Sequence, residues 1–221
     1  MANIPCPSMK VILCGDFGVG KTAIFKRFAN KNKSDPENNI FINLDHIENK
    51  FQISSSESIK IQLWDTAQLE KWSSIPNSYY KYSDAAILVY SLNDIKTFKS
   101  LPQYILDIVE NSPKCKYFYL CGNKNNLNAS NQDDNLVTKR MLDNFITDCG
   151  NMKIKSYTLS TISPEKIKLN IEFESMFQDI AKDLNTSYRQ SQVIQFNPAL
   201  LKIIKDNPLY DKNETNNCNY C

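Results

Sequence analysis

Residues 15–22, GDFGVGKT, combine residue types in an order that suits phosphate chemistry. They fit the pattern G-x-x-x-x-G-K-[ST], and three of the chain's five glycines fall within it. Glycines let successive backbone N–H groups converge on phosphate oxygens, and the positive end of a following helix adds to the attraction. We expect the Lys21 ammonium to contact the β- and γ-phosphates and the Thr22 hydroxyl to ligate Mg²⁺. The residues expected around the nucleotide phosphates are Gly15, Phe17, Gly18, Val19, Gly20, Lys21, Thr22 and Ala23.

The elements that flank this loop have the order that a phosphate loop requires. An apolar run at Lys10–Cys14 predicts a strand, and apolar residues at helical spacing over Thr22–Ala29 predict a helix. This context favours a phosphate loop over a glycine turn before an ordinary helix. The motif alone does not choose the nucleotide, since kinases and ATPases also carry it.

The rest of the chain alternates between strand and helix patterns. The continuous apolar runs Ala85–Tyr90 and Tyr117–Cys121 are typical of strands covered on both faces. Further predicted strands are Phe51–Ile53, Ile59–Leu63 and Ile154–Leu159, and the predicted helices are Phe98–Glu110, Lys139–Cys149 and Ile171–Leu184. The alternation predicts a doubly wound α/β domain whose ligand sits at the carboxyl ends of the strands.

Length and composition narrow the class of protein. The chain has 221 residues, 42% hydrophobic and 23% charged, which is typical of a globular protein. Its 26 basic and 24 acidic residues give a net charge of +2, so we expect no nucleic-acid partner. There is no secretory signal and no run of about 18–20 apolar residues, so we expect an intracellular, soluble protein with its cysteines as thiols.

Several further motifs resemble those of one family. Residues 61–67 (IQLWDTA), 78–81 (SYYK) and 86–90 (AILVY) resemble the Rab pattern of small GTPases nearly residue for residue. Gly122-Asn123-Lys124 resembles the guanine-specificity motif, and Leu159-Ser160-Thr161 resembles the final base-binding motif. The chain is thus similar to Rab-type proteins of the Ras superfamily over about residues 9–184.

The resemblance implies an architecture and a ligand set. It implies a P-loop GTPase fold with a mostly parallel sheet, one antiparallel strand and helices on both faces. Residues 1–8 would be an N-terminal extension, 9–184 the GTPase domain and 185–221 a flexible tail. The ligands would be GTP or GDP with Mg²⁺, the metal being held by Thr22 and by Asp65 through water. The residues implied at the base are Asn123, Lys124, Asn126, Ser160, Thr161 and Ile162, and those implied on an effector face are His46, Trp64 and Tyr80.

Four departures from the family pattern concern hydrolysis. Gln68 replaces a glycine whose N–H meets the γ-phosphate, and Leu69 replaces the glutamine that orients the attacking water. Residues 40–45 contain no threonine for Mg²⁺, and Phe17 puts a ring where most relatives have a small residue. We expect slow GTP hydrolysis, because positioning is most of what such enzymes contribute.

A fifth departure concerns the base. Asn126 replaces the carboxylate that accepts hydrogen bonds from guanine N1–H and the exocyclic amine. An unsatisfied buried donor costs about 1–3 kcal/mol, so guanine affinity should fall by roughly one to two orders of magnitude. Xanthine nucleotides, which have a carbonyl in place of the exocyclic amine, should lose less affinity.

The chain's last residues bear on membrane attachment. Rab-like proteins are commonly prenylated on terminal cysteines, and here Cys218 and Cys221 fit that pattern approximately. Two lipid chains would anchor a protein stably, whereas one is marginal. The alternative is a pair of unmodified exposed thiols. The apolar segment Leu200–Ile204 could dock on a prenylation escort or have no partner.

The resemblance makes a membrane-recruited switch in vesicle traffic the leading hypothesis, with effectors and an exchange factor as further partners and peripheral attachment to intracellular membranes. One alternative is a pseudo-GTPase scaffold that acts by partner binding without nucleotide cycling, as Leu69 and Gln68 suggest. Another is an ATP-dependent small-molecule kinase. The Trp64-Asp65-Thr66 block and the Asn123-Lys124 pair argue against that kinase.

Overall fold

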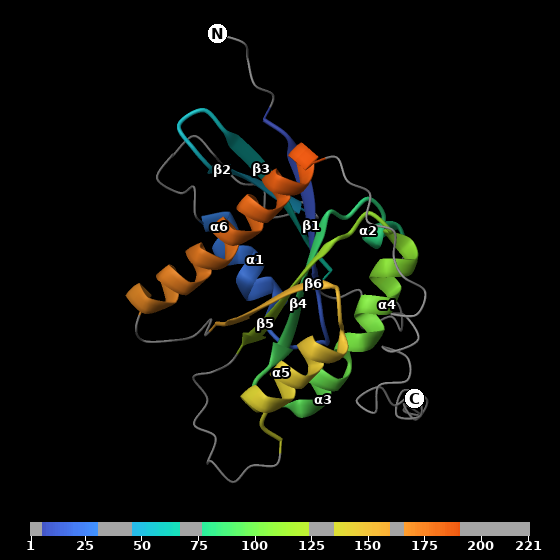
Figure 1. Cartoon of the computed structure of the whole chain (residues 1–221). Coiled ribbons are helices and arrows are strands. Elements are labelled where there is room, and N and C mark those ends of the chain that lie inside the picture. Colours follow the sequence, from blue (N-terminus) through green and yellow to red (C-terminus); the bar gives the residue numbers. More distant parts are fainter. Residues whose placement is uncertain (1–5, 31–45, 67–76, 124–134, 160–165, 191–221) are drawn as a thin grey trace.

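A computed structural model of the chain describes residues 6–30, 46–66, 77–123, 135–159 and 166–190. Its centre is a six-stranded sheet with the strand order β2-β3-β1-β4-β5-β6 (Figure 1). Only the β2–β3 pair is antiparallel. The strands are β1 (Ser8–Cys14), β2 (His46–Gln52), β3 (Ser58–Asp65), β4 (Ala85–Ser91), β5 (Tyr117–Asn123) and β6 (Lys153–Thr158). The predicted fold class, a mostly parallel sheet with one antiparallel strand, is confirmed.

Helices cover both faces of this sheet (Figure 1). They are α1 (Lys21–Asn30), α2 (Asn77–Tyr80), α3 (Ile95–Lys99), α4 (Leu101–Asn111), α5 (Lys139–Asp148) and α6 (Lys166–Gln190). Successive residues of β1 point to opposite faces, as the period of a strand requires. Val11 and Leu13 pack in the cluster beneath α1 and α6, whereas Ile12 and Cys14 pack in the cluster beneath α4 and α5.

The fully buried strands agree with the continuous apolar runs in the sequence. Every residue of β4 and β5 is buried, as expected for strands covered on both faces. The apolar stripe of the last helix is also confirmed, since each of its predicted members is at most 2% exposed. These members are Phe173, Met176, Phe177, Ile180 and Leu184.

Two helices differ from their predicted bounds. The single helix predicted over Phe98–Glu110 is two helices, α3 and α4, which meet at Ser100. Asp94 starts α3 by accepting a hydrogen bond from the Lys96 N–H, and Pro102 at the second position of α4 is suited to a helix start.

The last helix is longer than its apolar stripe. It continues to Gln190, six residues beyond the domain boundary placed at Leu184. Polar contacts hold this extension: Asn185 donates to the Glu57 carboxylate at 3.2 Å, and Arg189 pairs with the same carboxylate. The division into an extension, a domain and a tail stays a prediction. Within the described residues, no helix is long and apolar enough to cross a membrane.

Candidate nucleotide-binding site

The glycine-rich loop follows β1 at the carboxyl end of the sheet. Gly15, Gly18 and Gly20 have φ values of +139°, +80° and +106°, a region that side chains with a Cβ rarely adopt. At Gly15 a Cβ would also lie 2.1 Å from the carbonyl oxygen of Val89 on β4. The first glycine therefore serves close approach to the neighbouring strand as well as the turn.

The Lys21 side chain lies inside the loop. It is only 3% exposed, and its Nζ donates hydrogen bonds to the carbonyl oxygens of Gly15 and Asp16, both at 2.7 Å. Lysine at the first position of α1 thus brings its positive charge back toward the start of the loop. The N–H groups at the helix start and this ammonium present positive charge at the same edge of the sheet.

The two predicted metal ligands are brought together. The Thr22 hydroxyl donates to Asp65 Oδ2 at 3.1 Å, joining the start of α1 to the end of β3. Thr66 fixes this end of β3, because its buried hydroxyl donates to the Leu13 carbonyl at 2.5 Å. A hydroxyl and a carboxylate are oxygen ligands of the kind Mg²⁺ prefers, so the pair fits that ion.

A metal here would depend on other ligands as well. Among the described residues, no group of three or more His, Cys, Asp or Glu side chains could form a protein cage for a metal ion. Mg²⁺ is commonly held by one or two protein oxygens together with water and substrate phosphates. Thr22 and Asp65 suit that arrangement.

The first residue of the predicted base site is fastened to the phosphate loop. Asn123, at the end of β5, is fully buried, and its Nδ2 donates to the Val19 carbonyl at 2.8 Å. Next to it, the Leu159 N–H donates to the Gly122 carbonyl at 2.7 Å, so β6 ends beside β5. The two base-binding motifs therefore leave the sheet at neighbouring points.

Asp16 also contributes to the loop, although no sequence motif indicated a role for its side chain. Its carboxylate accepts hydrogen bonds from Ser100 Oγ at 2.8 Å and from the Tyr104 hydroxyl at 3.0 Å. Burial raises the pKa of Asp16, and these two hydrogen bonds and the charge of Lys21 act in the opposite direction. The partners lie 84 and 88 positions away, so no local pattern could have revealed this contact.

The Phe17 side chain is exposed, unlike that of Val19 in the same loop. It is 65% exposed, whereas Val19 is buried in the core beneath α1. The ring therefore lies at the protein surface beside the phosphate loop. Ala23 lies in the first turn of α1 and is exposed.

The predicted effector residues separate into two groups. His46 and Trp64 stack with ring centroids 4.5 Å apart, and Tyr79 meets Trp64 edge-on at 6.5 Å. β2 and β3 bury their alternate residues toward α1, so this pair lies on the other side of the sheet. Tyr80, which the resemblance implied on the effector face, is instead 2% exposed and packs in the cluster beneath α4, so it is not available to a partner. Tyr79 is the aromatic that contacts Trp64.

Several site residues from the sequence lie outside the described part of the chain. They are Gln68, Leu69, Lys124, Asn126, Ser160, Thr161, Ile162, Cys218, Cys221 and the segment 40–45.

The sheet order, the glycine-rich loop and the paired Thr22 and Asp65 define a nucleotide-binding protein of the P-loop class. A model of the Ras family matches residues 10–186. The chain therefore belongs to the Ras family, and within it to the Rab-type small GTPases, as the following relatives indicate.

Three relatives with Rab names illustrate the similarity. The chain is 34% identical over 186 residues to the Ras-related protein RABG1 of Arabidopsis thaliana, covering 82% of this chain and 85% of that protein. It is 31% identical over 177 residues to the Ras-related protein Rab-13 of Mesocricetus auratus, covering 79% of each. It is 29% identical over 185 residues to the human Ras-related protein Rab-30, covering 84% of each.

Proposed function

We propose that this protein is a GTP- and GDP-binding switch in intracellular vesicle traffic that hydrolyses GTP slowly. The observation that carries the proposal is the enclosed Lys21 ammonium, held by the carbonyls of Gly15 and Asp16 in a loop of left-handed glycines. Burying an ammonium group is costly unless oxygen atoms accept from it, and phosphate oxygens at the mouth of this loop would add acceptors to the two carbonyls.

The surrounding residues support binding of a nucleotide with Mg²⁺. Thr22 and Asp65 supply two oxygen ligands 3.1 Å apart. Asn123 links the start of the base site to Val19 in the phosphate loop. The residues that would meet phosphate, metal and base are thus connected to one another across three strands.

Slow hydrolysis is inferred from the sequence. Leu69 has no hydrogen-bonding group with which to orient a water molecule, and Gln68 adds a side chain where the family has glycine. Retained binding with weakened hydrolysis predicts a protein that stays in the GTP-bound form for long periods unless a partner supplies the missing groups.

The base specificity is expected to be relaxed at Asn126. Its amide offers one acceptor where guanine presents two donors. Asn126→Asp should therefore strengthen GDP binding about tenfold or more and weaken binding of xanthosine diphosphate. Equal effects on the two nucleotides would show that residue 126 does not read the base.

Partner binding and membrane attachment complete the proposal. His46, Trp64 and Tyr79 form an aromatic group on the sheet that is suited to effector contact. An exchange factor would release the nucleotide. Prenyl groups on Cys218 and Cys221, delivered with an escort protein, would hold the chain on the cytoplasmic side of an intracellular membrane.

Single-turnover hydrolysis tests this function against a pseudo-GTPase. Protein loaded with radiolabelled GTP should retain the nucleotide and convert it to GDP at a low but measurable rate. A rate indistinguishable from zero, with GTP still bound, would support the scaffold that Leu69 and Gln68 suggest. Failure to load any guanine nucleotide would contradict the switch itself.

A further inference from the structure

Lysines gather at the end of the sheet that lies away from the phosphate loop. The segments 8–10, 79–84, 112–117 and 151–153 enter β1, β4, β5 and β6 at their amino ends. They contain five lysines and one carboxylate, Asp84, although the whole chain has a net charge of only +2. We call these residues the amino-end surface: Lys10, Lys81, Tyr82, Lys114, Lys116 and Lys153.

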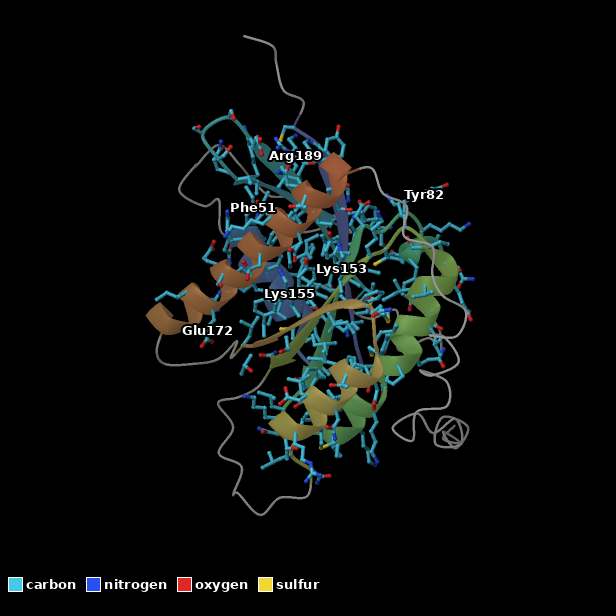
Figure 2. The ribbon with its side chains drawn as sticks, viewed as in Figure 1. Phe51, Tyr82, Lys153, Lys155, Glu172 and Arg189 are labelled. Carbon is cyan, nitrogen blue, oxygen red and sulfur yellow. The ribbon has the colours of Figure 1, made fainter. Side chains whose placement is uncertain are left out.

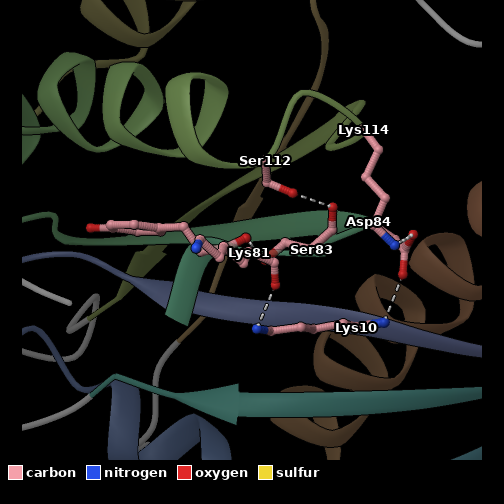
Figure 3. A network of polar contacts seen from close by, with 7 residues as sticks. Lys10, Lys81, Ser83, Asp84, Ser112 and Lys114 are labelled. Carbon is pink, nitrogen blue, oxygen red and sulfur yellow. Dashed lines mark hydrogen bonds and ion pairs between the residues drawn. The ribbon is translucent and has the colours of Figure 1, made fainter. Parts of the chain in front are cut away.

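Described contacts join Lys10, Lys81, Asp84 and Lys114, while Tyr82, Lys116 and Lys153 belong to the same end through the segments that carry them (Figure 3). The Lys10 ammonium donates to the carbonyl oxygens of Tyr79 and Lys81 at 2.6 and 2.9 Å. Asp84 accepts from the Lys10 backbone N–H at 2.9 Å and from the Lys114 ammonium at 2.8 Å. Lys10 thus ties the turn after α2 to β1, and Asp84 joins it to the loop before β5.

The positive charges are crowded. Burial lowers the pKa of Lys10, and the charge of Lys114 lowers it further, while Asp84 acts in the opposite direction. Asp84 already pairs with Lys114, so it offsets little of the remaining charge. The ammonium groups of Lys81 and Lys116 form no ion pair within the described residues. Glu110, in the last turn of α4, and Glu57, before β3, add two acids to this end, but Glu57 is paired with Arg189, so an excess of positive charge remains.

Tyr82 lies among these lysines in an unfavourable conformation. It is the only non-glycine residue of the described chain with a positive φ, +62°, and its side chain is 76% exposed. A bulky residue in this region is a true outlier, and such strain tends to persist where function needs the side chain. Tyr82 lies in the turn after α2, where the Ser83 N–H donates to the Tyr80 carbonyl at 3.2 Å, and this turn leaves the ring at the surface, where a partner can reach it.

The last helix ends at the same end of the molecule. Arg189 pairs with Glu57, which directly precedes the first residue of β3, and β3 runs parallel to β1 from its amino end. Figure 2 shows Arg189 and Tyr82 in the upper part of the view and Glu172, near the start of α6, lower down at the left edge of the domain. Residues 191–221, with the two proposed lipid sites, therefore continue from the end that carries the amino-end surface.

We propose that the amino-end surface rests on an anionic membrane, with Lys81, Lys114, Lys116 and Lys153 near lipid phosphates and the Tyr82 ring at headgroup depth, while Lys10 holds the surface together from within. Amphipathic aromatic rings favour the membrane interface, and each lysine near an anionic leaflet strengthens binding about fivefold. A tail of this length could reach roughly 100 Å when extended and would leave the domain free to turn. The surface would select one orientation, with the phosphate loop directed away from the membrane. This orientation rests on the proposed lipid attachment, whereas the surface itself can be tested without lipid.

The test uses the full unlipidated chain and vesicles. Binding to vesicles of phosphatidylserine and phosphatidylcholine in equal parts should be measurable by co-sedimentation, absent with phosphatidylcholine alone, and weakened by salt. Lys81→Glu with Lys116→Glu should lower partitioning at least about twentyfold, since two attractive charges become repulsive. Lys139→Glu with Arg140→Glu changes net charge equally on exposed residues of α5 and should alter partitioning less than about threefold.

Tyr82→Gly provides a second test, because it should change stability and vesicle binding in opposite directions. The glycine relieves the backbone strain, so the melting temperature should rise while vesicle binding falls several-fold. Equal loss of binding in the two charge variants, or no binding to anionic vesicles by the parent chain, would overturn the membrane surface. Guanine nucleotide binding is measured on the same samples. If the protein binds nucleotide but not vesicles, the membrane proposal fails while the proposed switch function stands.

Discussion

The side-chain amide of Asn123 donates a hydrogen bond to the carbonyl oxygen of Val19 at 2.8 Å, across 104 positions of sequence. This contact fastens the start of the predicted base site to the middle of the phosphate loop. Asn123 is fully buried and Val19 is 1% exposed, so water cannot replace the lost partner easily.

Asn123→Ala should therefore loosen the nucleotide. The buried Val19 carbonyl would lose its donor, a cost of about 1–3 kcal/mol, so GDP should dissociate about 5–150 times faster. Stopped-flow release of a fluorescent GDP analogue measures this rate. Asn185→Ala removes another buried amide, one bound to Glu57 at the far end of the sheet, and should leave the rate unchanged. Equal effects of the two variants would contradict a specific link.

Two glycines of the loop should differ in their tolerance of alanine. A Cβ at Gly15 would lie 2.1 Å from the Val89 carbonyl oxygen, whereas a Cβ at Gly18 meets nothing within 4 Å. Gly18→Ala should cost about 1–2 kcal/mol of stability from its positive φ alone. Gly15→Ala should cost about 3 kcal/mol or more, because backbone must move. Equal losses in denaturant unfolding would show that the loop does not need the close approach to β4.

Asp16 should make the stability depend on pH. Burial raises its pKa above the ordinary value of 3.8, so the folded state binds the proton more tightly than the unfolded chain does. The favourable contribution of the protonated form is complete below pH 3.8 and is lost as the pH rises through the folded-state pKa.

Asp16→Asn should therefore raise the melting temperature at neutral pH, and the gain should vanish as the pH falls toward 3.8. The amide can accept from Tyr104 and donate to Ser100, whose hydroxyl can reverse its role. Asp143→Asn, at an exposed position of α5, provides the control. A variant less stable than the parent at neutral pH would show that hydrogen bonds to the ionised carboxylate outweigh its burial.

Hydrolysis should respond to residue 69. Leu69→Gln restores a side chain that can orient water, so the single-turnover rate should rise about tenfold or more. Leu69→Met keeps the size and apolar character of leucine and should leave the rate near that of the parent. An unchanged rate with glutamine would place the deficit elsewhere, at Gln68 or at the threonine missing from residues 40–45.

The fold could be predicted from the sequence where the local hydrophobic pattern was clear. The continuous apolar runs of β4 and β5 predicted strands covered on both faces, and both strands are fully buried. The one antiparallel strand that the resemblance implied is β2, paired with β3. The features that the sequence did not predict depend on contacts between residues that are distant in the sequence. The break at Ser100 coincides with its contact to Asp16, and the extension of α6 rests on Glu57.

The candidate site was predictable in part for the same reason. Local motifs identified the loop and the pair Thr22 and Asp65, which the fold brings within 3.1 Å. Neighbouring tyrosines gave no local signal for which one is buried, because that depends on how the short helix α2 sits on α4. Tyr80 points into the core and Tyr79 contacts Trp64.

The nucleotide released by denaturing the purified protein, compared with that released by Lys21→Ala, tests the central claim most directly. Guanine nucleotide close to one equivalent is expected from the parent chain, because the Lys21 ammonium and the loop N–H groups hold the phosphates. The alanine variant should release little or none. An empty parent protein, or full retention of nucleotide by the variant, would contradict this account of the site.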